Sequence, residues 1–311
     1  MAKTNEIAKQ VADKVIALME EHGADGWTKG WTSKMAEGLP FNIASNKNYN
    51  GINIMLLSLA SLEKGYRSSA WGTFKQWQAK GGNLKGQKAE DVYFWKPLLI
   101  DEKDASGKVI KDDEGNKLQK KIWMLKNYKV FNRDQVAGLE DEAPADADAA
   151  PIVVFNNDEV DAWVDHTGAN VRHGGASAFY SPASDHVQMP NREDFTGTAT
   201  STAEETYYTT LLHELVHWSG AKHRLDRTKG KRFGDSDYAF EELVAETGAA
   251  ILAVQLGVSP EPRADHAQYL NGWIKGLKDN PKAIFSAFTQ ATKAAEYLNG
   301  LQPGASEEVA A

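Results

Sequence analysis

Apolar and polar positions repeat with two different periods along the N-terminal part of the chain. The helical period of about 3.6 residues occurs in three stretches, at about residues 5–22, 51–64 and 73–80. Two β-prone stretches, at about 91–99 and 122–131, flank a charged segment with Gly-containing turns at 101–121. This arrangement predicts an exposed hairpin inserted in a sheet. We expect the Gly- and Trp-rich stretch 23–42 to be a loop.

The C-terminal part begins with short extended segments and ends with helices. The strand-like segments are PIVVF from Pro151, VRHGG from Val171 and AFYSPASDHVQMP from Ala178. Two strong helical patterns follow near 203–219 and 238–256, and the rest is helical up to a tail, LQPGASEEVAA, which we expect to be disordered. Strands followed by helices within one segment are typical of an α+β fold.

Between the two parts lies a segment that offers nothing to bury. Residues 139–151, LEDEAPADADAAP, contain no large apolar side chain after Leu139, which predicts a solvated acidic linker. A chain of 311 residues is long enough for two domains. We therefore expect an N-terminal domain at residues 1–138 and a C-terminal domain at residues 152–311.

The charge of the chain changes sign at the same place. Residues 1–138 contain 22 Lys and Arg against 16 Asp and Glu, a net charge of +6. Residues 139–311 contain 13 against 27, a net charge of −14. The basic half can approach a polyanion and the acidic half cannot, so we expect the two domains to have different partners.

Composition also restricts the chemistry. The chain contains no cysteine, so a metal site must use His, Asp and Glu, which favours zinc or another divalent ion. The N-terminal sequence carries charges throughout, unlike a signal peptide. No apolar run reaches the roughly 20 residues that span a bilayer. We expect a cytoplasmic protein without membrane contact.

The segment HELVHWSG contains the motif H-E-x-x-H. His213 and His217 are one helical turn apart, so their side chains project from the same face and can bind one ion. Glu214 lies beside them and can act as a general base. Thr202 and Glu205 fit a capping box at the start of this helix, and Gly220 is a plausible C-terminal stop. Apolar neighbours indicate a buried helix, where two histidines and a glutamate without a ligand would be costly.

Two residues are candidates for the third ligand. His223 would complete the string H-E-x-x-H-x-x-G-x-x-H of the metzincins, but that pattern needs a methionine farther along the chain. The last methionine is Met189, so the requirement is not met. We therefore interpret His223 as a surface residue in a basic group with Lys222, Arg224 and Arg227.

The other candidate lies in the segment YAFEELVAETGAAILAVQLG. Glu242 and Glu246 are one turn apart and face one side of this second helix. We predict that Glu242 binds the metal, as in glutamate zincins, and that Glu246 orients a ligand histidine from the second shell around the metal. Glu241 points about 100° away and could exchange roles with Glu242 only if the helix were rotated.

Two imidazoles and one carboxylate leave an open coordination position, which is typical of catalytic zinc sites. The resulting hypothesis is a metal-dependent hydrolase in which the metal polarises a carbonyl and Glu214 takes a proton from water. The sequence does not identify an oxyanion-stabilising group. Tyr180 and His186 are candidates, with packing in an edge strand as an equal alternative. An extended peptide could add to that strand.

The basic half places aromatic residues among its cations. Residues 61–100 contain seven Lys and Arg against three Asp and Glu. Cations that follow phosphates and rings that stack on bases are the components of single-stranded nucleic-acid binding. The candidate DNA-binding residues are Trp27, Trp31, Tyr66, Arg67, Trp71, Phe74, Lys75, Lys85, Lys88 and Lys96. The alternative is that the rings form a domain core and the lysines are solvated surface residues.

Taken together, five segments resemble one known family. NKNYNGINIMLL, GYRSSAWGTFKQ and VYFWK, followed by HELVHWSG and EELVAE, are similar to the ArdC antirestriction proteins of conjugative plasmids. The resemblance implies an N-terminal domain that binds single-stranded DNA, shared with TraC-type plasmid primases, and a zincin-like C-terminal domain. It also implies protection of incoming plasmid DNA from host restriction. By this resemblance His213, His217 and Glu242 would bind metal and Glu214 would be catalytic, whereas His223 departs from the expected motif.

Three functions stay open at this point. The chain could cleave a host protein or peptide while bound to DNA, or it could shield DNA with a structural metal site. It could also be a primase accessory factor, although the N-terminal half shows no acidic triad for two-metal nucleotidyl transfer. A metallopeptidase fold does not by itself demonstrate peptidase activity.

Overall fold

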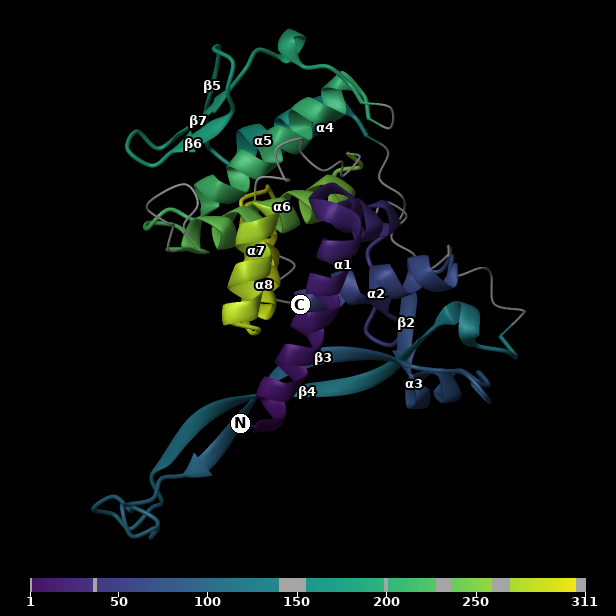
Figure 1. The fold of residues 1–311 in the computed structure, drawn as a ribbon, viewed down its shortest axis with the longest axis vertical. Helices are drawn as coiled ribbons and strands as arrows, with labels where there is room; N and C mark the ends of the chain where they lie inside the picture. The colour runs from purple at the N-terminus through teal and green to yellow at the C-terminus, as the bar shows by residue number, and fades with distance from the viewer. Residues whose placement is uncertain are drawn as a thin grey trace.

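The computed structural model describes residues 2–35, 38–139, 155–198, 201–227, 236–258 and 269–305. The N-terminal part contains α1 (Ala2–Met35), β1 (Phe41–Asn42), α2 (Ile52–Lys64), β2 (Ala70–Thr73), α3 (Phe74–Ala79), β3 (Glu90–Asp101), β4 (Gln119–Asn132) and the 3-10 turn η1 (Arg133–Gln135). Its strands form a sheet in the order β1-β2-β4-β3 (Figure 1). Only β1 and β2 run parallel; the other neighbours are antiparallel.

The C-terminal part places a small sheet over a set of helices. It contains α4 (Asn157–His166), β5 (Asn170–His173), β6 (Phe179–Ser181), β7 (His186–Met189), the 3-10 turn η3 (Arg192–Asp194), α5 (Ala203–Ser219), α6 (Ser236–Gln255), α7 (Leu270–Asp279) and α8 (Ala283–Asn299). The sheet, in the order β5-β7-β6, lies at the opposite end of the molecule from the β3–β4 hairpin (Figure 1). The predicted α+β fold is confirmed, and none of the described helices is long and apolar enough to cross a membrane.

The first helix is longer than the apolar pattern predicts. α1 continues to Met35, so residues 24–35 of the predicted loop are helical. Gly23 has a φ of 72° and joins two helical pieces across a kink, a conformation that costs glycine little because it has no Cβ. The prediction was wrong because glycine content was taken as the sign of a loop, whereas α1 continues through Gly26 and Gly30.

Most other elements lie where the pattern places them. The predicted hairpin is confirmed, since β3 and β4 pair from Glu90↔Val130 to Asp101↔Gln119. The pattern missed α4, whose N-cap Asn156 accepts a hydrogen bond from the backbone N of Asp158 at 3.0 Å. Most of the predicted linker 139–151, the strand predicted from Pro151 and the end of the tail lie outside the described residues.

The two halves of the chain share one hydrophobic core. A single cluster of buried residues includes members of α1, α2 and β4 together with members of α5, α6, α7 and α8. At the junction, the rings of Tyr93 and Trp95 on β3 lie 5.9 and 6.4 Å from the ring of Phe285 on α8, in edge-to-face geometry. The backbone N of Gly51 also donates to Thr292 Oγ1 at 3.0 Å. The boundaries 1–138 and 152–311 therefore stay predictions, and the core is continuous across them.

A buried side chain of α2 closes the free edge of β3. Asn53, 1% exposed, accepts a hydrogen bond from the backbone N of Tyr93 at 2.7 Å and donates to its carbonyl at 2.8 Å. The side-chain amide thus takes the place of a neighbouring strand for this residue, since buried backbone groups need partners. The interaction fixes α2 against the sheet.

Candidate functional site

The helix that carries the H-E-x-x-H motif has the predicted ends. Thr202 Oγ1 accepts from the backbone N of Glu205 at 3.1 Å, and Glu205 Oε2 accepts from the backbone N of Thr202 at 2.8 Å. This capping box starts α5, and Gly220 caps its C-terminus. His213 and Glu214 are 1% and 3% exposed, so the predicted burial of the motif is confirmed.

A glycine allows α6 to approach α5 closely beside the motif. A Cβ on Gly248 would lie 2.9 Å from Val216 Cγ2, a distance that real Cβ contacts do not reach. Val216 directly precedes His217 on α5. The absence of a side chain on Gly248 therefore brings the glutamates of α6 within reach of the histidines of α5.

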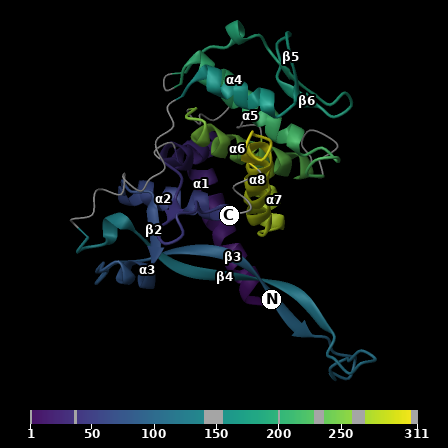
Figure 2. The ribbon, with the colours of Figure 1, turned by 180° about the vertical axis from the view of Figure 1, so that it is seen from behind.

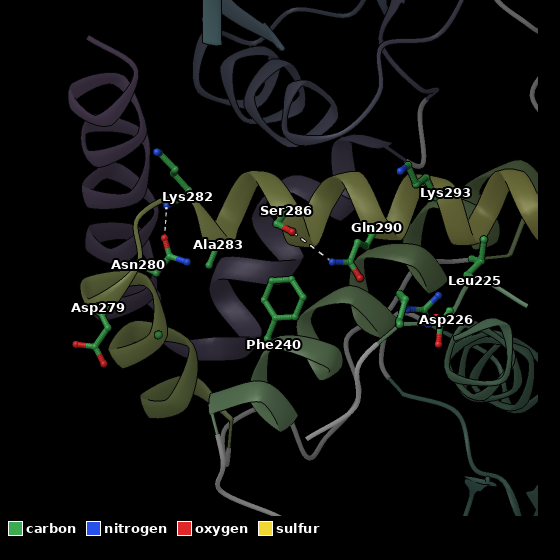
Figure 3. A pocket seen from close by; sticks show the side chains of 12 residues that line it. Leu225, Asp226, Phe240, Asp279, Asn280, Lys282, Ala283, Ser286, Gln290 and Lys293 are labelled. Atoms are coloured by element: carbon green, nitrogen blue, oxygen red, sulfur yellow. Dashed lines mark hydrogen bonds between the residues drawn. The ribbon is translucent and has the colours of Figure 1, made fainter. Parts of the chain in front are cut away.

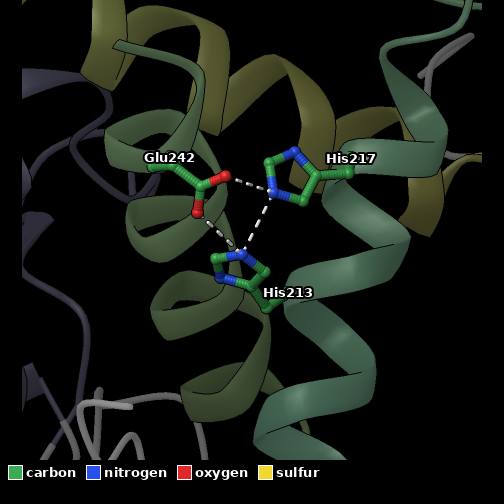
Figure 4. Close-up of side chains that lie close together, drawn as sticks. All are labelled: His213, His217 and Glu242. Carbon is green, nitrogen blue, oxygen red and sulfur yellow. Dashed lines mark hydrogen bonds and ion pairs between the residues drawn. The ribbon is translucent and has the colours of Figure 1, made fainter. Parts of the chain in front are cut away.

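The two histidines and Glu242 converge on one point between these helices (Figure 4). The Nε2 atoms of His213 and His217 are 3.0 Å apart. The carboxylate oxygens of Glu242 lie 3.4 Å from His213 Nε2 and 3.5 Å from His217 Nε2. Among the described residues these three offer ligand atoms within 4.8 Å of one another, in a buried position.

Each histidine turns its other ring nitrogen toward a separate carboxylate. His213 Nδ1 lies 3.0 Å from Glu246 Oε1, and His217 Nδ1 lies 3.2 Å from Glu241 Oε1. A carboxylate favours hydrogen on the ring nitrogen that faces it, and a neutral ring protonated at Nδ1 would direct its Nε2 lone pair at the common point. A cation placed between two lone pairs and a carboxylate would be attracted by all three. The residues present thus fit a divalent metal ion.

The acids around this point stay ionised although they are buried. Burial alone would raise the pKa of Glu241, but hydrogen bonds from His217 and Arg227 lower it to about 2. Burial likewise opposes ionisation of Glu242, and the neighbouring His213 and His217 side chains hold its pKa well below the usual range. The site therefore presents negative charge to the ion that it would bind.

Sequence reasoning missed the role of Glu241. It lies beside Glu242 on α6 and contacts both His217 and Arg227, whose guanidinium Nη2 is 2.9 Å from Glu241 Oε1. Glu241 takes this role without a rotation of α6, because it contacts Nδ1 of His217 while Glu242 faces the Nε2 atoms of both histidines. A Cβ on Gly220 would lie 2.8 Å from Arg227 Nη2, so glycine at the end of α5 makes room for this buried cation.

The predicted basic surface group is only partly correct. The side chains of Arg224 and Arg227 are 6% and 4% exposed, so both arginines are buried rather than on the surface. His223 is 64% exposed and its Nε2 lies 3.3 Å from Asp185 Oδ2, away from the cluster. The arginines are buried because each has a carboxylate partner, Asp185 for Arg224 and Glu241 for Arg227.

Three polar side chains near the site have defined partners. The Tyr180 hydroxyl donates to Asp185 Oδ1 at 2.8 Å, and His186 Nδ1 lies 2.7 Å from Ser184 Oγ, which favours packing over an oxyanion role for both. Tyr238, one turn before Glu242, was not singled out by the sequence. Burial raises the pKa of Tyr238, and a hydrogen bond to Glu242 adds to the effect. Tyr238 thus contacts the proposed ligand from one turn earlier on α6.

A cavity beside α6 is separate from this site. A cavity of about 890 Å³ lies against α6, α7 and α8 with Phe240 on its wall (Figure 3). Phe240 and Glu242 are about 200° apart around α6, and none of the converging residues lines the cavity. Its charged residues are of both signs, with Lys282 and Lys293 beside Asp226 and Asp279, so it favours no particular ligand charge.

The candidate DNA-binding residues differ in their exposure to solvent. Trp71 was wrongly predicted to stack on bases, because it is fully buried and packs edge-on against Tyr66 at 5.9 Å. Trp27 and Trp31 lie on the second piece of α1, and their side chains are outside the described part. Tyr66 is half-buried. The exposed candidates are Arg67, Phe74, Lys75, Lys85, Lys88 and Lys96.

Comparison with known proteins agrees with both halves of this arrangement. Residues 5–131 match the family model for the N-terminal domain of anti-restriction factor ArdC, and residues 158–290 match that for a zincin-like metallopeptidase. A crystal structure of the antirestriction ArdC protein from the R388 plasmid is 36% identical, with a TM-score of 0.73, and the match covers 94% of this chain and 97% of that one. This chain belongs to the ArdC antirestriction family.

Relatives of the ArdC family outside the solved structures match over the same length. The uncharacterized protein y4eC of Sinorhizobium fredii is 35% identical over 96% of this chain and 94% of its own length. A DNA primase TraC of Escherichia coli is 33% identical over 93% of this chain, which spans only 19% of that primase. The similarity to TraC therefore extends through both halves, beyond the N-terminal domain to which the sequence resemblance assigned it.

A solved relative also bears on the metal. A Mn(II)-bound structure of the R388 ArdC protein is 33% identical, with a TM-score of 0.71, and the match covers 96% of this chain and 98% of that one. A divalent ion is consistent with the buried His213, His217 and Glu242 of this chain.

The zinc affinities of two alanine variants should show whether Glu242 or His223 is the third ligand. Glu242→Ala should weaken zinc binding by more than about 100-fold, beyond the loss typical of outer partners, because it removes one of three ligands. His223→Ala should change the affinity by less than about twofold, within the variation of surface changes. Competition with a chromophoric chelator measures both. An equal loss in the two variants would restore the metzincin-type assignment.

Glu241 offers a second test of the same centre. Glu241→Gln should lower zinc affinity by about 10- to 100-fold, because a neutral amide holds the His217 Nδ1 proton less firmly. The matched control is Glu204→Gln, an exposed carboxylate on α5. If Glu241→Gln bound zinc as tightly as the control in the same chelator assay, Glu241 would have no part in orienting His217.

Proposed function

We propose that this chain is a plasmid antirestriction protein that binds single-stranded DNA and carries a zinc-dependent peptidase site. The observation that carries the proposal is the convergence of His213, His217 and Glu242 beside Glu214, in a chain whose N-terminal part is basic. The antirestriction role follows from family membership, and protection of incoming conjugated DNA is the form that we propose for it.

The donor set supports zinc in a catalytic site. Two neutral imidazoles and one carboxylate are a common catalytic zinc set and leave a position open. Bound zinc would supply a Lewis acid that polarises a peptide carbonyl. Glu214 would accept a proton from the attacking water and pass it to the leaving amine. Glu241 and Glu246 would hold the two imidazoles in the required tautomer, and Glu242 would be kept ionised by its histidine neighbours.

The basic half supports the nucleic-acid role. Its net charge of +6 is carried on a part of the chain that also matches the ArdC N-terminal domain model. A relative is named as a DNA primase, which is consistent with a shared ability to contact DNA. The shared core joins the two halves through α8, which contacts both the metal helices and β3, so the proposed DNA-binding and metal sites belong to one packed unit.

Glu214→Gln separates a peptidase from a protein that only shields DNA. We expect this variant to bind zinc as the unaltered chain does and to lose protection of an incoming plasmid in a conjugation assay, because the proton acceptor is removed. Thr210→Ser, a part-buried position on α5 one turn earlier, serves as the control. Full protection by a zinc-loaded Glu214→Gln protein would reject the proteolytic form and leave DNA shielding.

DNA binding should depend steeply on salt. Neutralising Lys75, Lys85 and Lys88 together with glutamine should reduce the slope of log affinity against log salt by about 2, since each phosphate contact on a single strand contributes roughly 0.7. Lys293→Gln, an exposed lysine of α8, should leave the slope unchanged. Fluorescence anisotropy with a labelled oligonucleotide measures it. Binding that does not respond to salt would remove the argument from the basic half.

A further inference from the structure

The β3–β4 hairpin extends from the rest of the molecule as a two-stranded ribbon (Figures 1 and 2). Eight large apolar side chains are strongly exposed among the described residues, and five of them lie along this hairpin: Leu98, Leu99, Leu118, Trp123 and Tyr128. Apolar side chains gathered on one exposed element indicate contact with another molecule.

The two faces of the ribbon have different surroundings, because successive side chains of a strand point to opposite sides. One face carries Tyr93 and Trp95, which pack on Phe285 of α8. On this face Lys129 is paired with Asp91, Nζ to Oδ2, at 2.7 Å. These contacts direct this face toward the shared core over its inner half.

The opposite face combines rings with cations. We call it the ribbon face and define it by Phe94 and Lys96 on β3 and by Lys126 and Tyr128 on β4. Phe94 is directly opposite Lys126, and its ring meets that of Tyr128 edge-on at 5.7 Å. Lys96 Nζ lies 5.2 Å from the centre of the Tyr128 ring, within cation–π range. Both lysines are exposed, and Tyr128 is 36% exposed.

The local charge favours a polyanion. Residues 115–133, which contain the whole of β4, include six Lys and Arg and no Asp or Glu. This run has a higher density of positive charge than residues 61–100, on which the sequence argument rests. Since the ribbon face contains no acid among its four residues, a second copy of the same face would be repelled by it.

We propose that the ribbon face binds single-stranded nucleic acid, with a base stacked on Tyr128 and phosphates held by Lys96 and Lys126. Phe94 packs against Tyr49 and the core and supports the Tyr128 ring from that side. The inference rests on the proposed DNA-binding function and adds the ribbon face to the lysines of α3 and the following loop as a second contact surface. A single strand is the occupant because its bases are free to stack on rings, whereas the bases of a duplex already stack on one another. The lysines of α3 and the following loop lie toward the other end of the sheet from the hairpin tip (Figure 1).

The test uses the full chain and a short fluorescent oligothymidylate in an anisotropy titration. Tyr128→Ala should weaken binding by about tenfold, the loss of one stacked base, and Tyr128→Phe should restore it because the ring is kept. Lys126→Gln should reduce the salt slope by about 0.7. On an oligomer of the same length without bases, Tyr128→Ala should bind as the unaltered chain does.

The matched control is Lys129→Gln, which makes the same change of charge on the same strand but on the opposite face. It should bind as the unaltered chain does. If the unaltered chain binds the oligomer and both ribbon-face variants bind equally well, the ribbon assignment is overturned and the proposed function stands. If the ribbon variants lose binding only to duplex DNA, the assignment to a single strand is overturned. If the unaltered chain binds no single strand at all, the proposed function itself fails.

Discussion

Three hydrogen-bond acceptors directed at one buried point are the constraint on which the C-terminal half depends. His213, His217 and Glu242 face one another at 3.0–3.5 Å in a buried site, an arrangement that positive charge between them would stabilise. Glu241 and Glu246 strengthen the constraint, because each lies beside the Nδ1 atom on the far side of an imidazole and favours hydrogen there. A bound metal would therefore stabilise the folded chain as well as supply reactivity, since the unfolded chain has no such cluster.

The scaffold around this point explains why the acids reach it. His213 lies beside Glu246, and His217, one turn later on α5, lies beside Glu241, which comes earlier on α6. The helices α5 and α6 therefore run antiparallel at the site. Gly248 lets the two helices approach beside Val216, and α8 packs behind them. Phe285 of α8 in turn contacts two rings of β3. The strand that carries one edge of the ribbon face is thus in direct contact with the helix that supports the metal centre.

Local sequence patterns predicted the parts of the fold that depend on neighbouring residues. The capping box at Thr202, the histidine pair and the hairpin turns all act over a few residues, so their side chains need no distant partner to be recognised. The extension of α1 beyond Gly23 was not predicted, because glycine composition alone does not distinguish a kink from a loop. The contact that closes the edge of β3 was not predicted either, because Asn53 makes it from a helix 40 residues away in sequence.

The sequence by itself determined which residues could bind a metal, because one-turn spacing places two side chains on one face of any helix. The sequence also singled out Glu242 as the third ligand, because its one-turn spacing from Glu246 predicts that both acids lie on one face of a second helix. Only the tertiary structure decided that Glu241 supports His217 and that Trp71 is buried, because both outcomes depend on which helix or strand packs opposite. Side-chain direction follows from local geometry, whereas the identity of a partner follows from packing across the whole chain.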